Sequence, residues 1–143
     1  MSDGNVTLHA TCVAVGDAGI LITGPSGSGK SALALQLLAF GGILVADDRT
    51  ILHRDGNSLI AAPPKTIAGM IEARGVGILS VGHLHRIKVA VVVNMAMLEI
   101  ERLPQRHSIT VLDLVLPCLH KVDAPYFPAA VHAYVAAIRK ETS

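Results

Sequence analysis

Gly24-Pro25-Ser26-Gly27-Ser28-Gly29-Lys30-Ser31 is the stretch that decides the fold of this 143-residue chain. It fits the pattern G-x-x-x-x-G-K-[ST] at every position, with an apolar strand pattern before it and an amphipathic helix pattern after it, as the pattern requires. Glycines let consecutive backbone N–H groups converge on phosphate oxygens, and the start of the helix adds its positive end. Lys30 would bridge the β- and γ-phosphates, and the Ser31 hydroxyl would coordinate magnesium. We therefore predict that residues 24–31 bind a nucleoside triphosphate, ATP, together with Mg²⁺.

Strand and helix patterns alternate on both sides of this P-loop. Runs of β-branched and other apolar residues predict strands, and apolar residues at helical spacing predict helices. The expected strands are 6–15, 20–23, 43–46, 87–95 and 108–115, with a hairpin over 50–62 turning at Asp55-Gly56, a further alternating stretch over 98–101, and helices over 30–40 and 66–73. The first two strands should pair as a hairpin. A last helix follows Pro125 and Pro128, with one apolar stripe formed by Val131, Tyr134, Val135 and Ile138. The fold class is α/β, a single P-loop domain over residues 1–143 with a mixed central sheet.

Two adjacent aspartates, Asp47 and Asp48, end the strand that follows the P-loop helix. In a strand–helix–strand unit both strands end at the same edge of the sheet, so these carboxylates should lie beside the bound phosphates. There, one of them could hold magnesium or act as a general base toward a hydroxyl. Without the P-loop, the same pair would be interpreted as the start of a solvated turn.

Composition narrows the class of protein. Hydrophobic residues make up 51% of the chain, charged residues 16%, and the formal net charge is +1, which argues against a nucleic-acid-binding protein. Cys12 and Cys118 are too few for a disulfide scaffold and are expected to be buried, reduced thiols. The N-terminal residues lack the pattern of a secretion signal, and the longest apolar run is too short to span a membrane. We expect a cytoplasmic protein.

Four motifs in order resemble those of the HPr kinase/phosphorylase family. They are the P-loop strand Ile20–Gly24, the segment Leu44-Val45-Ala46-Asp47-Asp48-Arg49, the segment Ala61-Ala62-Pro63-Pro64, and Ile71-Glu72-Ala73-Arg74-Gly75-Val76-Gly77-Ile78-Leu79. The likeness covers roughly residues 6–80. It implies the catalytic P-loop domain of an ATP- and Mg²⁺-dependent kinase that phosphorylates a serine of the phosphocarrier HPr and also catalyses the phosphorolysis of that phosphoserine.

The resemblance also implies roles for individual residues. Asp48 takes the place of the base that deprotonates the serine, with Asp47 as its neighbour and a candidate magnesium ligand, and His9 takes the place of a histidine near the reacting phosphate. Glu72 matches a magnesium-binding glutamate and Arg74 the arginine of the same signature. Arg102, in Ile100-Glu101-Arg102-Leu103-Pro104, is the candidate arginine that assists phosphoryl transfer, although Pro104 stands where the family usually has glycine.

The chain departs from the long family members in its C-terminal third, where residues 129–140 offer only a shortened version of the family's closing helix. Long members form hexamers and dock HPr partly through this region. The resemblance therefore implies a homo-oligomer, but it does not imply how HPr would bind to this chain. Two alternatives stay open: a small-molecule kinase with the same P-loop, and a nucleotide-dependent switch that transfers no phosphate. His83 and His85 are a poor metal pair, and the remaining histidines have no predicted role: His53, His107, His120 and His132.

Overall fold

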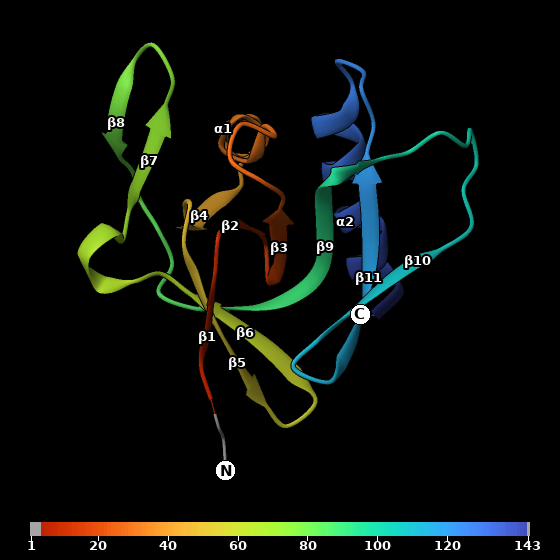
Figure 1. The fold of residues 1–143 in the computed structure, drawn as a ribbon, viewed down its shortest axis with the longest axis horizontal. Helices are drawn as coiled ribbons and strands as arrows, with labels where there is room; N and C mark the ends of the chain where they lie inside the picture. The colour runs from red at the N-terminus through yellow and green to blue at the C-terminus, as the bar shows by residue number, and fades with distance from the viewer. Residues whose placement is uncertain (1–3, 143) are drawn as a thin grey trace.

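A nine-stranded mixed sheet forms the centre of the computed structural model, which describes residues 4–142 (Figure 1). The strands are β1 (Val6–Leu8), β2 (Ala10–Val15), β3 (Ala18–Thr23), β4 (Ile43–Ala46), β5 (Thr50–Asp55), β6 (Ser58–Ala62), β9 (Ile87–Leu98), β10 (His107–Val111) and β11 (Leu114–Lys121). Their order is β1-β5-β6-β9-β3-β2-β4, and β11 also pairs with β9 and carries β10 at its outer edge. A separate hairpin of β7 (Met70–Ala73) and β8 (Gly77–Ser80) stands apart from this sheet, near α1 (Lys30–Ala39).

The long strand β9 joins the two halves of the sheet. Its start pairs with β6, its middle pairs in parallel with β3, and its second half pairs in parallel with β11. Because side chains alternate across a strand, β9 and β3 each contribute to a core on both faces of the sheet. Val91 and Val93 pack on one face with Ile20 and Ile22, while Val92 packs on the other face with Leu21.

The two faces are covered by different elements. The helix-side core places residues of α1 and of α2 (Phe127–Thr142) against the sheet, including Leu33, Leu37, Val131 and Val135. The hairpin-side core lies under β5–β6 and β10–β11 and includes Cys12, Leu52, Leu59, Val92 and Cys118. The expected apolar stripe of the last helix is thus confirmed, with Val131 1% and Val135 0% exposed. Among the described residues, neither helix has the length and apolar character needed to span a membrane.

The hairpin of β2 and β3 and the P-loop helix are confirmed, and so is the hairpin near Asp55-Gly56. The strand expected over 6–15 is interrupted at His9, which separates β1 from β2. Both cysteines are free and buried, as predicted, and burial raises the pKa of the Cys12 thiol to about 12. The thiol of Cys12 therefore stays protonated at neutral pH.

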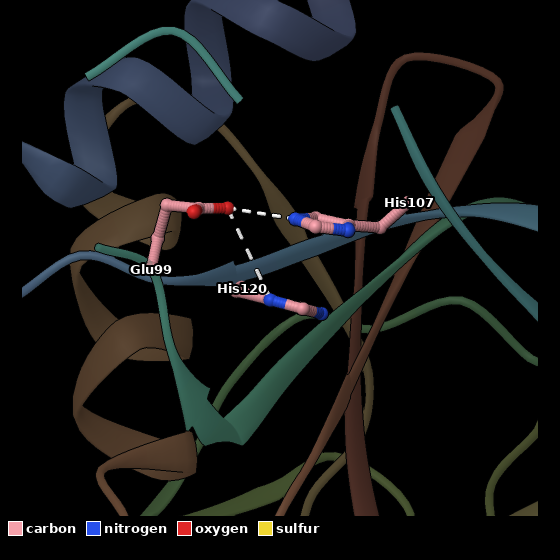
Figure 2. A group of neighbouring side chains, drawn as sticks. All are labelled: Glu99, His107 and His120. Carbon is pink, nitrogen blue, oxygen red and sulfur yellow. Dashed lines mark hydrogen bonds and ion pairs between the residues drawn. The ribbon is translucent and has the colours of Figure 1, made fainter. Parts of the chain in front are cut away.

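Three sequence-based predictions are wrong. The helix over 66–73 is a 3₁₀ turn (Lys65–Ile67) followed by strand β7, because a stretch this short fits either period and the pairing with β8 decides it. The strand over 108–115 is a hairpin that turns at Leu112-Asp113, between β10 and β11. The alternating pattern over 98–101 does not continue as a strand; β9 ends at Leu98, and Glu99 then turns toward His107 and His120 (Figure 2).

Candidate active site

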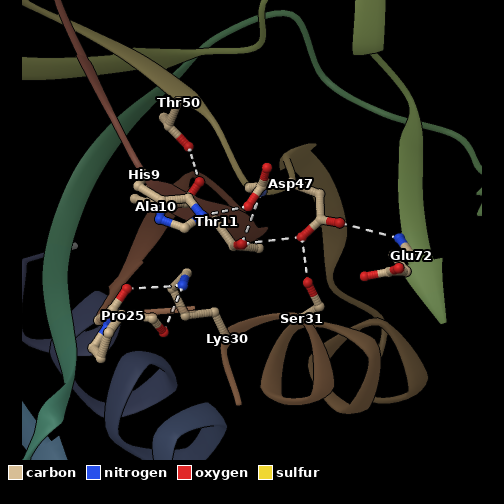
Figure 3. Close-up of polar contacts among 11 residues, drawn as sticks. His9, Ala10, Thr11, Pro25, Lys30, Ser31, Asp47, Thr50 and Glu72 are labelled. Carbon is tan, nitrogen blue, oxygen red and sulfur yellow. Dashed lines mark hydrogen bonds and ion pairs between the residues drawn. The ribbon is translucent and has the colours of Figure 1, made fainter. Parts of the chain in front are cut away.

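The phosphate edge of the sheet, where β3 and β4 both end, brings together the P-loop and the paired aspartates. β2 lies between these two strands and runs antiparallel to each, so β3 and β4 run in the same direction. Residues that follow them, Ser31 in the first turn of α1 and Asp47 after β4, are consequently neighbours. The Ser31 hydroxyl donates to Asp47 Oδ1 at 2.7 Å (Figure 3). The placement of both aspartates beside the P-loop was predicted from the strand–helix–strand pattern.

The P-loop backbone depends on glycine at defined positions. Gly24, Gly27 and Gly29 have φ of 144°, 84° and 99°, values that disfavour any residue with a Cβ atom. A Cβ on Gly24 would also lie 2.6 Å from Ser28 Oγ and 3.0 Å from Met95 Cβ. These two constraints leave little room for any other residue at the first position of the loop.

Polar groups in the loop are arranged for an anionic ligand. Lys30 is buried, and its ammonium donates to the carbonyl oxygens of Gly24 (2.8 Å) and Pro25 (3.1 Å). Among the described residues, Ser28 Oγ is buried without a hydrogen-bond partner, which is costly unless a ligand or water supplies one. The cradle and the unpartnered hydroxyl both fit a bound phosphate.

Asp47 is hydrogen-bonded to three different elements at the phosphate edge of the sheet. The residue is 7% exposed, and its carboxylate accepts three hydrogen bonds, at Oδ1 from the hydroxyls of Ser31 and Thr11 (3.0 Å), and at Oδ2 from the backbone N–H of Glu72 (3.0 Å). It therefore connects β2, α1 and β7. Figure 3 shows the Glu72 side chain on the side of β7 that faces Asp47 and Ser31, so three oxygen-bearing side chains converge there.

Asp48 differs from Asp47 in both backbone and exposure. Its φ of 69° lies in the left-handed region, which is unusual for a residue other than glycine and is frequent at functional sites. Its backbone N–H donates to Thr11 Oγ1 at 3.1 Å, so the same threonine positions both aspartates. The side chain of Asp48 is 60% exposed and forms a 2.6 Å hydrogen bond with His9 Nε2. A polar, paired carboxylate at the surface of a phosphate site can exchange a proton with an incoming hydroxyl.

The Asp48–His9 pair lies in a shallow hollow of about 410 Å³ lined by Thr7, Leu8, His9, Asp48 and Arg49. The break between β1 and β2 places His9 there. Since the hollow is open to solvent, a side chain from another molecule could reach Asp48. The geometry therefore separates a buried aspartate with three hydrogen bonds, Asp47, from an exposed aspartate paired with His9, Asp48.

The other predicted residues are less closely associated with the P-loop. Arg74 is exposed in the turn after β7. Arg102 is exposed in the loop between β9 and β10, which begins beside the phosphate edge and extends outward in Figure 1. His83 and His85 are in an edge-to-face arrangement at 5.1 Å.

Sequence reasoning missed two residues that contact this edge. Thr11 is polar within the wholly buried strand β2, and a buried hydroxyl needs a partner, so that mismatch was a usable signal. Lys121, at the end of β11, donates from Nζ to the Ser28 carbonyl oxygen at 3.2 Å. Nothing in the sequence predicted it, because the strand that carries it was not predicted.

Comparisons with known proteins agree with this geometry. The sequence model of the family described as the HPr serine kinase C-terminal domain matches residues 3–113, most of the chain. The chain belongs to this family. The HPr kinase/phosphorylase of Clostridium botulinum is 45% identical over 78 residues, which are 54% of this chain and 26% of that protein. The corresponding protein of Mycoplasmopsis pulmonis is 39% identical over 83 residues, 58% of this chain and 27% of that protein.

The likeness extends to three-dimensional structure. A solved structure of the HPr(Ser) kinase/phosphatase from Coxiella burnetii aligns with a TM-score of 0.81 at 26% identity, covering 96% of this chain and 98% of that one. The alignment includes the C-terminal part of this chain, which the family sequence model does not reach. Against the curated relatives, by contrast, the matched segment spans only about a quarter of their length.

Proposed function

We propose that this member of the HPr serine kinase family transfers the γ-phosphoryl group of ATP to a serine hydroxyl of an HPr-type phosphocarrier, and also catalyses the reverse phosphorolysis. The observation that carries the proposal is the exposed Asp48–His9 pair, 2.6 Å apart. It directly follows Asp47, whose carboxylate is hydrogen-bonded to Ser31 at the end of the P-loop. The names of the relatives, kinase and phosphorylase or phosphatase, support it.

Residues of the phosphate edge would hold the nucleotide and its metal. The backbone N–H groups of residues 24–29 and the Lys30 ammonium would bind the phosphates, and the buried Ser28 hydroxyl would gain a partner. Ser31, Asp47 and Glu72 supply the oxygen ligands that Mg²⁺ prefers. Magnesium held by these residues would supply positive charge that offsets the charge of the phosphates.

Asp48 is the proton acceptor in this proposal. As the serine oxygen forms its bond to phosphorus and the bond to the β-phosphate oxygen breaks, the serine proton passes to the Asp48 carboxylate. His9, hydrogen-bonded to the same carboxylate, orients it toward the hollow. Lys30 and Arg102 would offset the negative charge that develops on the transferred group. In the phosphorolysis, an oxygen of inorganic phosphate forms a bond to the phosphorus of the phosphoserine as the bond from phosphorus to the serine oxygen breaks. Protonated Asp48 gives its proton to the leaving serine oxygen, and pyrophosphate is released.

The test is phosphotransfer to a purified HPr-type phosphocarrier with labelled ATP and Mg²⁺. We expect acid-stable phosphoserine on the phosphocarrier, and release of that label as pyrophosphate when inorganic phosphate is added without ATP. Binding of ATP without phosphoserine on this acceptor would contradict the proposal. Label on a small molecule would instead indicate a small-molecule kinase, and ATP-dependent partner binding without transfer would indicate a switch.

A further inference from the structure

Three side chains from distant parts of the sequence meet at the end of the sheet formed by β9, β10 and β11. Glu99 follows β9, His107 begins β10, and His120 is near the end of β11. Glu99 Oε1 lies 2.8 Å from His107 Nε2 and 4.0 Å from His120 Nδ1, and all three ligand atoms lie within 4.8 Å of one another. Figure 2 shows both imidazole rings presenting a nitrogen to the same carboxylate oxygen.

The backbone holds these groups in place. His107 pairs with Cys118 across the hairpin, so His120, two residues further along β11, projects from the same face, and the two rings stack at 3.8 Å. The other oxygen of Glu99, Oε2, accepts the backbone N–H groups of Ile100 and Glu101, each at 3.1 Å. This second set of hydrogen bonds fixes Oε1 toward the histidines. The three side chains are only 10–32% exposed.

We propose that Glu99, His107 and His120 form a binding site for one transition-metal dication of the Zn²⁺ class. Two imidazole nitrogens and one carboxylate oxygen are a common zinc ligand set that leaves a fourth position for water. The carboxylate supplies one negative charge, and imidazole suits Zn²⁺ but not Mg²⁺. The site is therefore chemically distinct from the oxygen-ligand cluster at the phosphate edge.

Metal binding requires a small rearrangement of these side chains. Ligand atoms about 2.0–2.2 Å from a tetrahedral zinc ion lie roughly 3.2–3.5 Å apart. The distance from Glu99 to His107 must therefore lengthen slightly, and the distance from Glu99 to His120 must shorten by less than an ångström. The rings must also tilt out of their parallel stack, because the ion lies in the plane of each ring that binds it. Rotation about the imidazole χ2 torsion is soft enough to allow this tilt.

A metal at this position would tie together the exit of β9 and the two strands of the hairpin. The Glu99 backbone N–H already donates to the Lys121 carbonyl oxygen at 2.8 Å, and Lys121 Nζ reaches the P-loop at Ser28. Glu99 also begins the exposed loop that carries Arg102. A bound metal would consequently restrain the loop that follows Glu99. This inference does not depend on the proposed kinase activity.

The proposal is tested by titrating tag-free protein with ZnCl₂ in a calorimeter and with CoCl₂ in a spectrometer. We expect one Zn²⁺ per chain, visible d–d bands of four- or five-coordinate Co²⁺, and no displacement of either ion by excess Mg²⁺. X-ray absorption at the zinc edge should show nitrogen and oxygen ligands without sulfur. Wild-type protein that shows no binding at about 100 μM metal would overturn the proposal.

Substitutions of the three proposed ligands test whether Zn²⁺ binds at this cluster. His107→Ala and His120→Ala should each weaken Zn²⁺ binding by more than about tenfold. Glu99→Gln keeps acceptors for the two backbone N–H groups but removes the charge, and it should weaken binding to a similar extent while the metal-free protein stays folded. His53→Ala, a histidine on β5 outside the cluster, is the matched control and should leave the affinity unchanged. Equal Zn²⁺ affinity in wild type and in a folded Glu99→Gln protein would overturn the proposal.

Discussion

Positive φ angles occur at glycine in the P-loop but at a leucine and an aspartate in the turn of the β10–β11 hairpin. Gly24, Gly27 and Gly29 provide this conformation at little steric cost, whereas Leu112 (φ 50°) and Asp113 (φ 65°) do not. Leu112 is nevertheless held, because its side chain packs on the hairpin-side core and its carbonyl oxygen accepts from Arg54 at 3.2 Å. Thus the P-loop conformation is specified by local residues, and the hairpin turn by packing and contacts from elsewhere in the chain.

The largest effect is expected at Asp48, the proposed proton acceptor, which also has a positive φ. Asp48→Asn keeps the size and the backbone of the residue but removes the proton acceptor, so phosphotransfer should fall at least about 100-fold. Nucleotide affinity should stay within a few-fold of wild type, because Asp47 and not Asp48 contacts Ser31. The measurements are single-turnover transfer and nucleotide titration, with Asp55→Asn as control. Loss of nucleotide binding in Asp48→Asn would instead make this residue a metal ligand.

A substitution of Asp47, unlike one of Asp48, should have a large effect on the stability of the fold. Asp47→Ala leaves the buried Thr11 hydroxyl, and the partly buried Ser31 hydroxyl and Glu72 N–H, without their acceptor, at a cost of about 2–4 kcal/mol. For a chain of this length the melting temperature should fall by roughly 5–15 °C. Thermal unfolding checks this, with Asp55→Ala as control. A melting temperature equal to that of wild type would show that these hydrogen bonds contribute little.

Sequence predicted the phosphate edge better than the hairpin for a physical reason. A phosphate cradle needs glycine, lysine and serine at fixed spacing, and the strand–helix–strand connection then places Asp47 near Ser31. The roles assigned to Asp48, His9, Glu72 and Arg102 stay predictions. The Leu112-Asp113 turn has none of the usual Asn-Gly or Asp-Gly signals, so the hairpin was missed. Because the hairpin was missed, two further features could not be predicted: the contact of Lys121 with the P-loop, and the cluster of Glu99, His107 and His120. The register of the strands decides both features.

Lys121 connects the two regions, and its substitution tests whether the hairpin influences the P-loop. Lys121→Met removes the donor to the Ser28 carbonyl oxygen, so the loop should be held less firmly in its binding conformation. A loss of about 1 kcal/mol would weaken nucleotide affinity about fivefold. Lys88→Met, an exposed lysine on β9, is the control. Unchanged affinity in Lys121→Met would mean that the P-loop conformation is independent of the hairpin.

A stabilising substitution tests the strain in the hairpin turn directly. Asp113 is exposed at the second position of a two-residue turn in which both residues have positive φ, the position where glycine is favoured. Asp113→Gly should stabilise the protein by about 0.5 kcal/mol, seen as a rise of about 1–2 °C in melting temperature. Asp55→Gly, at the end of β5 where φ is not positive, should destabilise it. A lower melting temperature for Asp113→Gly would show that the turn is not strained at this residue.

The smallest expected effect is at the β2–β3 turn, where Asp17 is 89% exposed and pairs with Arg139 of α2 at 2.9 Å. The hydrogen bond from Arg139 holds the pKa of Asp17 below its usual value of 3.8. Because the folded-state pKa is depressed, the pair stabilises the protein above pH 3.8, and this contribution is lost as the pH falls through the folded-state pKa. Asp17→Asn should therefore lower the melting temperature slightly near neutral pH, and the difference from wild type should vanish in acid. A difference that persists at the lowest pH would show that Asp17 acts through the turn conformation and not through its charge.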